Sequence, residues 1–237
     1  MIDKRKLDRI LKKVEKPARY IGMEINSVNK DLEDKVKFAF CFPDIYDVGM
    51  SHMGLHILYN LINEEDDFLC ERVFSPWTDM EELMRQEDIP LFTLESKEEV
   101  RNFDFLGFTL QYEMSFTNIL NILDLARIPL LSRDRGEEDP IIIAGGPCAY
   151  NPEPIADFID VFVIGEGEEI VLELLNKYKE HKANKGDKES FLREILSIKG
   201  IYIPKFYKVE YKEDGTIKEM IPLIEEAPKR IEKRMKF

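Results

Sequence analysis

The sequence has little of what marks secreted, membrane or disulfide-rich proteins. Its 237 residues include three cysteines, Cys41, Cys70 and Cys148. Their odd number and wide spacing are typical of reduced cytosolic thiols and not of a disulfide framework. No apolar run approaches the roughly 20 residues of a membrane span, and the charged start lacks the apolar stretch of a secretory signal. We therefore expect a cytoplasmic protein without a membrane segment.

The familiar phosphate-binding and metal-binding motifs are also absent. No Gly-x-Gly-x-x-Gly follows the first apolar run, and no glycine pair precedes Lys-Ser or Lys-Thr. Two of the three histidines, His52 and His56, have the spacing of a metal-binding pair, but no third ligand is evident. A solvated helix face explains both without a metal. We therefore predict no metal site and no catalytic residue in this chain.

Negative charge dominates, but it is unevenly distributed. The formal net charge is -13, while residues 1–19 carry eight basic and three acidic residues and residues 228–237 carry five and one. Subtracting +5 and +4 from the total leaves -22 for the middle of the chain. An acidic body of this kind argues against a broad nucleic-acid surface. The two basic ends are interpreted as solvated helix faces, with binding arms as the alternative.

What the chain does have is an alternation of apolar runs with helical patterns. Hydrophobic residues make up 44% of it, enough for a globular core. Strands are predicted at 35–44, 69–75, 90–94, 103–110, and as two runs within 141–164. Helices are predicted at 7–14, 51–63, 77–86, 115–127, and from about 168 to 178. This order predicts a doubly wound, mainly parallel α/β sheet of five or six strands, flavodoxin-like or cobalamin-binding-like.

The helix at 51–63 shows a clear periodicity. At 100° per residue, one arc collects Met53, Leu55, Ile57, Leu58, Leu61 and Ile62. The opposite arc collects His52, His56, Tyr59, Asn60 and Asn63. Ser51 and Ser115 stand where helix caps belong. Trp77, beside Phe74 and Pro76, is expected to be an aromatic core contact.

Composition divides the chain into three parts. Residues 34–182 form the α/β domain, preceded by an N-terminal helix and an extended lead-in over residues 1–33. Residues 183–237 begin with a polar linker and continue as a short helix. A β-hairpin around Asp214-Gly215 follows, and then the start of a linker towards a further domain.

Four loops follow the carboxyl ends of predicted strands, where ligands bind in an open α/β sheet. Glycine there lets a flat ligand or another backbone approach closely. The predicted ligand-binding residues are Gly49, Met50, Ser51, His52, Leu110, Gln111, Tyr112, Gly145, Gly146, Pro147, Gly165, Glu166, Gly167 and Glu168. Two alternatives stay open. The two glutamates could serve only to stabilise a helix N-terminus, and the glycines could serve only tight turns against neighbouring loops.

The loop sequences occur in a recognisable order. They are FPDIYDVGMSHMG, FDFLGFTLQYEMS, IIIAGGPCAYNPEPIADFIDVFVIGEGEE and the trailing GIYIPKFYKVEY. Together they resemble the N-terminal cobalamin-binding-like, Rossmann-like domain of a radical SAM protein family, over about residues 17–227. The resemblance implies a partner, a radical SAM barrel that holds a 4Fe–4S cluster on C-x-x-x-C-x-x-C and cleaves S-adenosylmethionine. The three cysteines here cannot form that motif, so cluster and S-adenosylmethionine would belong to a domain outside this chain.

The resemblance also makes cobalamin a candidate cofactor, although this chain departs from the usual pattern. Cobalamin domains carry Asp-x-His-x-x-Gly in the first loop, whereas here no histidine stands two places after Asp47. Thr109-Leu110-Gln111 replaces their later Ser-x-Leu, and only Gly145-Gly146 is retained. Two functions remain. One is an accessory domain that presents a corrinoid or substrate to the barrel. The other is a non-catalytic docking module that has kept the fold without the ligand.

Overall fold

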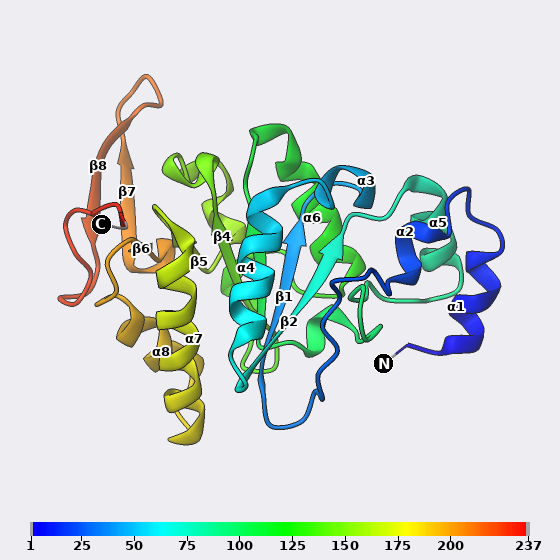
Figure 1. The fold of residues 1–237 in the computed structure, drawn as a ribbon. Coiled ribbons are helices and arrows are strands. Elements are labelled where there is room, and N and C mark those ends of the chain that lie inside the picture. The colour runs from blue at the N-terminus through cyan, green and yellow to red at the C-terminus, as the bar shows by residue number, and fades with distance from the viewer. Residues whose placement is uncertain (1, 236–237) are drawn as a thin grey trace.

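The computed structural model describes residues 2–235, and its centre is a six-stranded sheet (Figure 1). The strands are β1 Val36–Phe42, β2 Phe68–Phe74, β3 Phe105–Thr109, β4 Ile141–Gly145, β5 Val161–Val163 and β6 Ile201–Tyr202. They lie in the order β2-β1-β3-β4-β5-β6, and every pairing is parallel except the antiparallel β5–β6. The first five strands follow the flavodoxin-like order, which confirms the predicted fold class.

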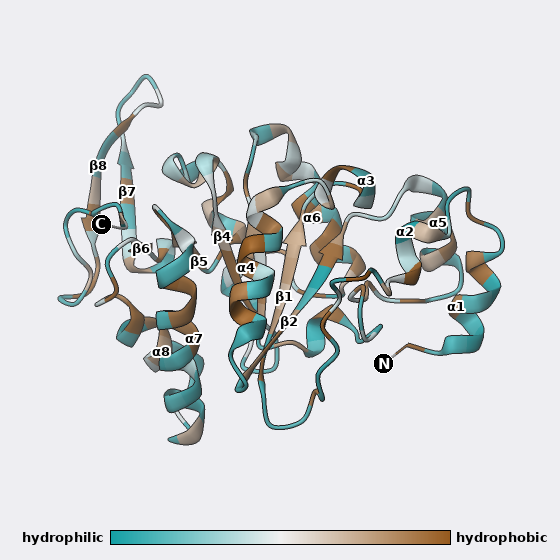
Figure 2. Ribbon diagram, in the orientation of Figure 1, coloured by the Kyte–Doolittle hydropathy of each residue, from teal (hydrophilic) through white to brown (hydrophobic). Residues whose placement is uncertain are grey.

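Helices cover both faces of this sheet. One layer contains α4 Met53–Glu64, α7 Gly167–Ala183 and α8 Lys188–Ile195, and the other contains α1 Lys4–Leu11, α5 Thr78–Gln86 and α6 Phe116–Leu125. Side chains alternate along each strand, so Phe38 and Phe40 pack towards the first layer while Ala39 and Cys41 pack towards the second. Figure 2 shows the result, with hydrophobic central strands and mixed colouring on α4 and α7.

Short elements connect these layers. They are α2 Ala18–Ile21, α3 Tyr46–Gly49, and the 3-10 turns η1 Val100–Asn102, η2 Glu113–Ser115, η3 Ser132–Asp134, η4 Pro147–Tyr150, η5 Glu153–Phe158 and η6 Pro204–Phe206. The predicted hairpin is confirmed as β7 Tyr207–Tyr211 and β8 Ile217–Pro222, standing beside the main sheet (Figure 1). Within residues 2–235 no helix has both the length and the apolar character required to cross a membrane.

The predicted strand at 90–94 is wrong, because this segment is a buried covering loop. Its only β-type pairing among the described residues is an isolated bridge between Phe92 and Glu99. The backbone N–H of Leu91 donates to Leu125, and that of Leu94 donates to the carbonyl of Arg72 in β2. The segment thus satisfies the outer edge of β2 without forming a ladder of its own.

The predicted faces of α4 need correction as well. Tyr59 and Asn63, assigned to the polar arc, are buried, whereas Met53 is 71% exposed and Ile57 46%. The Tyr59 hydroxyl accepts the N–H of Val28 in the lead-in, and the Asn63 amide bonds both backbone groups of Cys70. Polar partners therefore draw these two residues inward.

Two capping predictions and one core prediction also change. The α4 N-cap is His52, whose Nδ1 accepts the N–H of Leu55, while the Ser51 hydroxyl donates to Val48. Ser115 does precede α6, but its hydroxyl donates backwards to the Tyr112 carbonyl. Trp77 is not a core contact, since it is 41% exposed with the Arg19 guanidinium over its ring.

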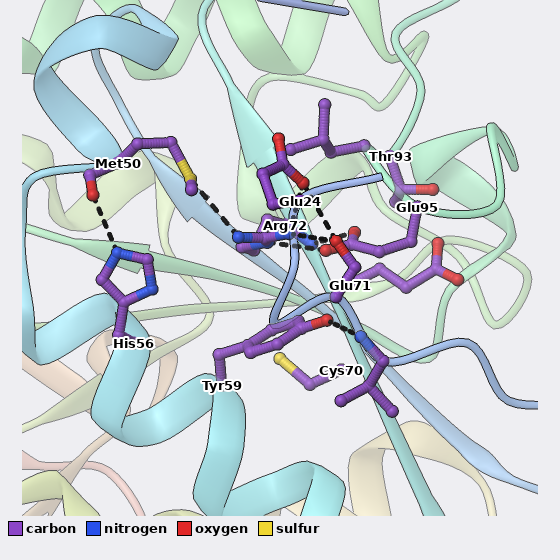
Figure 3. A network of polar contacts seen from close by, with 12 residues as sticks. Glu24, Met50, His56, Tyr59, Cys70, Glu71, Arg72, Thr93 and Glu95 are labelled. Atoms are coloured by element: carbon purple, nitrogen blue, oxygen red, sulfur yellow. Dashed lines mark hydrogen bonds and ion pairs between the residues drawn. The ribbon is translucent and has the colours of Figure 1, made fainter. Parts of the chain in front are cut away.

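A buried polar network ties the N-terminal lead-in to the sheet (Figure 3). Arg72 in β2 donates from Nε to Glu95 and from Nη2 to Glu24, at 2.6 and 2.9 Å. Its guanidinium also lies over the ring of Tyr59, and its backbone N–H donates to Glu95. The two carboxylates therefore neutralise the buried guanidinium, and Glu95 also accepts a backbone N–H at the outer edge of β2. That edge is then closed to pairing with another strand.

Candidate functional site

A cavity opens at the carboxyl edge of the parallel strands, between α4 and α7. Its volume is about 300 Å³. The sheet provides the floor through Phe38, Phe40, Gly107 and Ile143, and the helices provide the walls through Ile57, Leu58, Val171 and Leu174. The site is concave and mostly apolar with a few polar groups at its mouth, as small-molecule sites generally are.

The structure brings together part of the predicted site. His52, Gln111, Gly145, Gly146, Gly165, Glu166, Gly167 and Glu168 line the cavity, so all four loops meet at one edge. Gly49, Met50, Ser51, Leu110, Tyr112 and Pro147 do not line it. Gly49 is buried against Phe74, and Leu110 belongs to the core on the opposite face of the sheet. Met50 points towards Arg72 (Figure 3).

Two of the glycines are bare because the protein's own backbone packs against them. A Cβ on Gly146, at φ +102°, would lie 2.9 Å from the carbonyl oxygen of Leu110. A Cβ on Gly165, at φ +122°, would lie 2.2 Å from the carbonyl oxygen of Arg234. Side chains at Gly145 and Gly167 would meet only ordinary contacts at 3.6 Å. The tight-turn interpretation therefore describes Gly146 and Gly165, whereas at Gly145 and Gly167 an added Cβ would be tolerated.

Sequence reasoning missed the floor and walls of the cavity. The floor residues alternate along β1 and β4, which is the pattern that could have found them. Gly107, in the interior of β3, was the clearest signal, since glycine inside a strand marks a close approach. A Cβ there would lie 2.4 Å from the Phe38 ring, so Gly107 gives that ring its place above the sheet.

Polar groups at the mouth have defined hydrogen bonds. Gln111 Nε2 donates to Thr109 Oγ1 at 2.6 Å, which fixes the amide across the end of β3. Because His52 Nδ1 accepts the N–H of Leu55 at 3.1 Å, the neutral ring carries its proton on Nε2. His52 is therefore suited to donate a hydrogen bond from Nε2. Metal ligation through Nε2 would require a proton on Nδ1, and Nδ1 could then no longer accept the Leu55 N–H that caps α4.

The second histidine of the pair is also bonded to backbone. His56 Nε2 donates to the Met50 carbonyl at 2.8 Å, below the α3–α4 turn (Figure 3). Across residues 2–235, no group of three or more His, Cys, Asp or Glu side chains is arranged to hold a metal ion.

The three thiols lie apart. Cys41 and Cys70 belong to the cores on opposite faces of the sheet, and burial raises the pKa of both well above its usual value. Cys148, in η4, is half-buried, and burial together with nearby Glu113 raises its pKa. All three thiols thus stay protonated near neutrality, which is unlike a reactive or metal-ligating thiolate.

Several apolar side chains on elements at the carboxyl edge of the sheet are exposed. Met53 and Ile57 lie on α4, Tyr112 and Met114 follow β3, and Tyr150 ends η4. Met114 is 84% exposed. The Tyr112 hydroxyl donates to Asp44 in the first loop, and that carboxylate raises the tyrosine pKa. Exposed apolar residues that cluster on one edge indicate a contact surface.

Comparison with known proteins finds a matching family model and a related sequence. The family model for radical SAM proteins, N-terminal, matches residues 54–204, well over half of the chain. "Uncharacterized protein MJ0966" of Methanocaldococcus jannaschii is 28% identical over 142 residues, which cover 59% of this chain and 26% of that protein.

A solved structure shows a distant likeness. The radical S-adenosylmethionine methyltransferase TsrM from Kitasatospora setae, with cobalamin and a 4Fe–4S cluster bound, aligns at 15% identity and a TM-score of 0.43. The alignment covers 76% of this chain and 28% of that one. The chain thus spans about a quarter of the length of each of these two proteins.

Proposed function

The chain belongs to the family of N-terminal domains of radical SAM proteins, and from that premise we propose that it is an accessory domain. It would hold a corrinoid, or the substrate, for a radical SAM barrel elsewhere in the same protein. The 4Fe–4S cluster and S-adenosylmethionine would be bound by that barrel. The observation that carries the proposal is the cavity at the carboxyl edge, where four loops from separate strands converge.

The residues of the cavity fit part of a corrinoid. A volume of about 300 Å³ admits one flat heteroaromatic group, such as the nucleotide base of cobalamin, but not the corrin ring. Phe40 and Ile143 would pack against such a group from the floor, and Leu58 and Val171 from the helices. The corrin ring exceeds this volume, so residues outside the cavity would have to hold it.

The polar groups at the mouth suit a ligand bordered by amides. His52 Nε2–H can donate to a carbonyl oxygen, and Glu168 can accept from an amide N–H. Gln111, held by Thr109, can orient a third amide through the free lone pairs of its carbonyl. Corrinoids carry amide side chains around the ring. When bound, the cofactor would supply methyl-transfer or redox chemistry at cobalt, while this chain binds, orients and shields it.

The apolar rim supports the same arrangement from outside. Met53, Tyr112, Met114 and Tyr150 are exposed on elements at the carboxyl edge, where the cavity opens, so a domain seated on this edge would bury them and cover the cavity. Apolar residues of this kind form the centre of protein interfaces. We propose the radical SAM barrel of the same protein as the occupant of this surface.

A docking module without a ligand is the second candidate. The packing of Leu110 against Gly146 and of Arg234 against Gly165 favours it, because these glycines serve the protein's own loops. In that case the rim would bind the barrel and the cavity would stay empty.

A titration separates the two candidates. The chain is mixed with hydroxocobalamin, its absorbance spectrum is followed, and the mixture is passed over a gel-filtration column. A corrinoid spectrum that co-elutes with the protein at one equivalent supports the accessory domain. Complete separation of pigment from protein supports the docking module.

A further inference from the structure

The C-terminal tail of the described chain packs against the loops that form the cavity. Arg234 forms a parallel bridge with Gly165, the last residue before the α7 N-cap. The Arg234 N–H donates to the Ile164 carbonyl at 3.0 Å, and the Glu166 N–H donates to the Arg234 carbonyl at 3.2 Å. The tail therefore forms a one-residue parallel bridge beside the segment that follows β5.

Side chains add to this backbone pairing. The Arg234 guanidinium lies 3.2 Å from Glu169 and 3.5 Å from Glu173, both in the first two turns of α7. Lys233 stands over the ring of Tyr150, which ends the turn after Gly146. Two consecutive tail residues thus contact the two glycine loops of the cavity, one each.

The tail is also anchored on its N-terminal side. The Tyr207 hydroxyl donates to the Pro228 carbonyl at 2.8 Å, and Ala227 and Ile231 pack against the two hydrophobic cores. In Figure 1 this end of the chain lies beside β7 and β8. The segment from β8 to Arg234 is therefore held against the domain by several contacts along its length.

We propose that the tail, residues 231–234, is an integral part of the ligand site, with Arg234 as the positioning residue for the Gly165–Gly167 loop. Arg234 does not line the cavity, so it acts through that loop. Gly165 carries no side chain because the Arg234 carbonyl occupies the place of its Cβ. The tail and the cavity wall are then joined by the bridge between Arg234 and Gly165.

Hydrogen exchange of individual amides tests the positioning role directly. Arg234→Pro removes the donor to Ile164, and Gly165→Ala drives a Cβ into the Arg234 carbonyl. Arg234→Ala keeps the backbone bonds and removes only the ion pairs, and the exposed Arg230→Ala is the charge-matched control. We expect the Glu166 amide to exchange at least about tenfold faster in Arg234→Pro and Gly165→Ala, and unchanged in Arg230→Ala. Amides of β3 serve as the internal reference.

The same variants are then titrated with hydroxocobalamin. This arm rests on the proposed function, whereas the exchange arm does not. We expect about tenfold weaker binding in Arg234→Pro than in Arg230→Ala. Exchange of Glu166 that is equal in all variants would overturn the positioning role, whether or not the wild-type chain binds the corrinoid. Faster exchange with unchanged affinity would overturn the coupling to the ligand site.

Discussion

Arg72 and Glu95 form a buried ion pair at the edge of the sheet, with Nε 2.6 Å from Oε1 and neither side chain more than 2% exposed. Burial raises the Glu95 pKa, and the Arg72 charge opposes that shift. The pair joins β2 to a loop some twenty residues away, and Glu24 extends it to the N-terminal lead-in. The stability of the domain therefore depends on the ion pairs of the buried Arg72 guanidinium with Glu95 and Glu24.

Replacement of Arg72 tests that dependence. Arg72→Ala leaves the buried Glu95 without its cation, so we expect a loss of about 3–5 kcal/mol in the free energy of unfolding by urea. The matched control is Arg85→Ala, whose ion pairs with Glu81 and Asp124 are exposed. It should cost no more than about 1 kcal/mol. Equal costs for the two variants would show that the buried pair has no special role.

Acid should weaken the attachment of the lead-in. Burial alone would raise the Glu24 pKa, but backbone and Tyr46 hydrogen bonds and the Arg72 charge lower it below the usual 4.5. Because the folded-state pKa is depressed, Glu24 stabilises the fold above about pH 4.5, and this contribution disappears as pH falls through the lower value. The stability difference between wild type and Glu24→Gln should therefore shrink below pH 4.5. A difference that stays constant from pH 7 to pH 3 would contradict this.

His52 combines a helix cap with a ligand-facing N–H, and two substitutions separate these roles. Asn can accept the Leu55 N–H as His52 does, whereas Ala cannot. We expect His52→Ala to lose about 1 kcal/mol of stability and His52→Asn much less. Both variants should bind hydroxocobalamin more weakly, since both lack Nε2–H. Full affinity in His52→Asn would show that the capping role is the only one.

Iron–sulfur reconstitution should leave this chain without a cluster. Cys41 and Cys70 are buried on opposite faces of the sheet, and Cys148 packs against the core that contains Cys41, so no three thiolates can meet. After anaerobic incubation with iron and sulfide, iron content should match that of a variant with all three cysteines replaced by serine. A stoichiometric cluster with its charge-transfer absorbance would refute this assignment.

The sequence predicted the sheet because its strands are apolar on both faces and alternate with helical patterns, which together are typical of a covered parallel sheet. Topology then placed His52, Gln111 and Glu168 at one edge. The sequence could not predict that Tyr59 would turn inward, because its partner Val28 comes from the lead-in. Nor could it predict that the Arg234 backbone packs against Gly165, since the two residues are far apart in the chain and meet only in the folded structure.

The glycine with the most diagnostic value is therefore Gly145 and not its neighbour. A side chain at Gly146 would strain its own turn, so loss of binding there would be ambiguous. At Gly145, which lines the cavity, a Cβ meets only ordinary contacts with Val163 and the backbone is not at positive φ, so a valine there is expected to narrow the cavity without straining the turn. Gly136 has nothing within 4 Å of an added Cβ, and Gly136→Val is the matched control.

Equilibrium titration of wild type, Gly145→Val and Gly136→Val with hydroxocobalamin, followed by absorbance, tests the central claim most directly. Unfolding curves of the three proteins serve to establish that each is folded. The account predicts one bound corrinoid in wild type and Gly136→Val, and at least about tenfold weaker binding in Gly145→Val. Equal affinity in all three, or none in the folded wild type, would contradict a corrinoid site in this cavity.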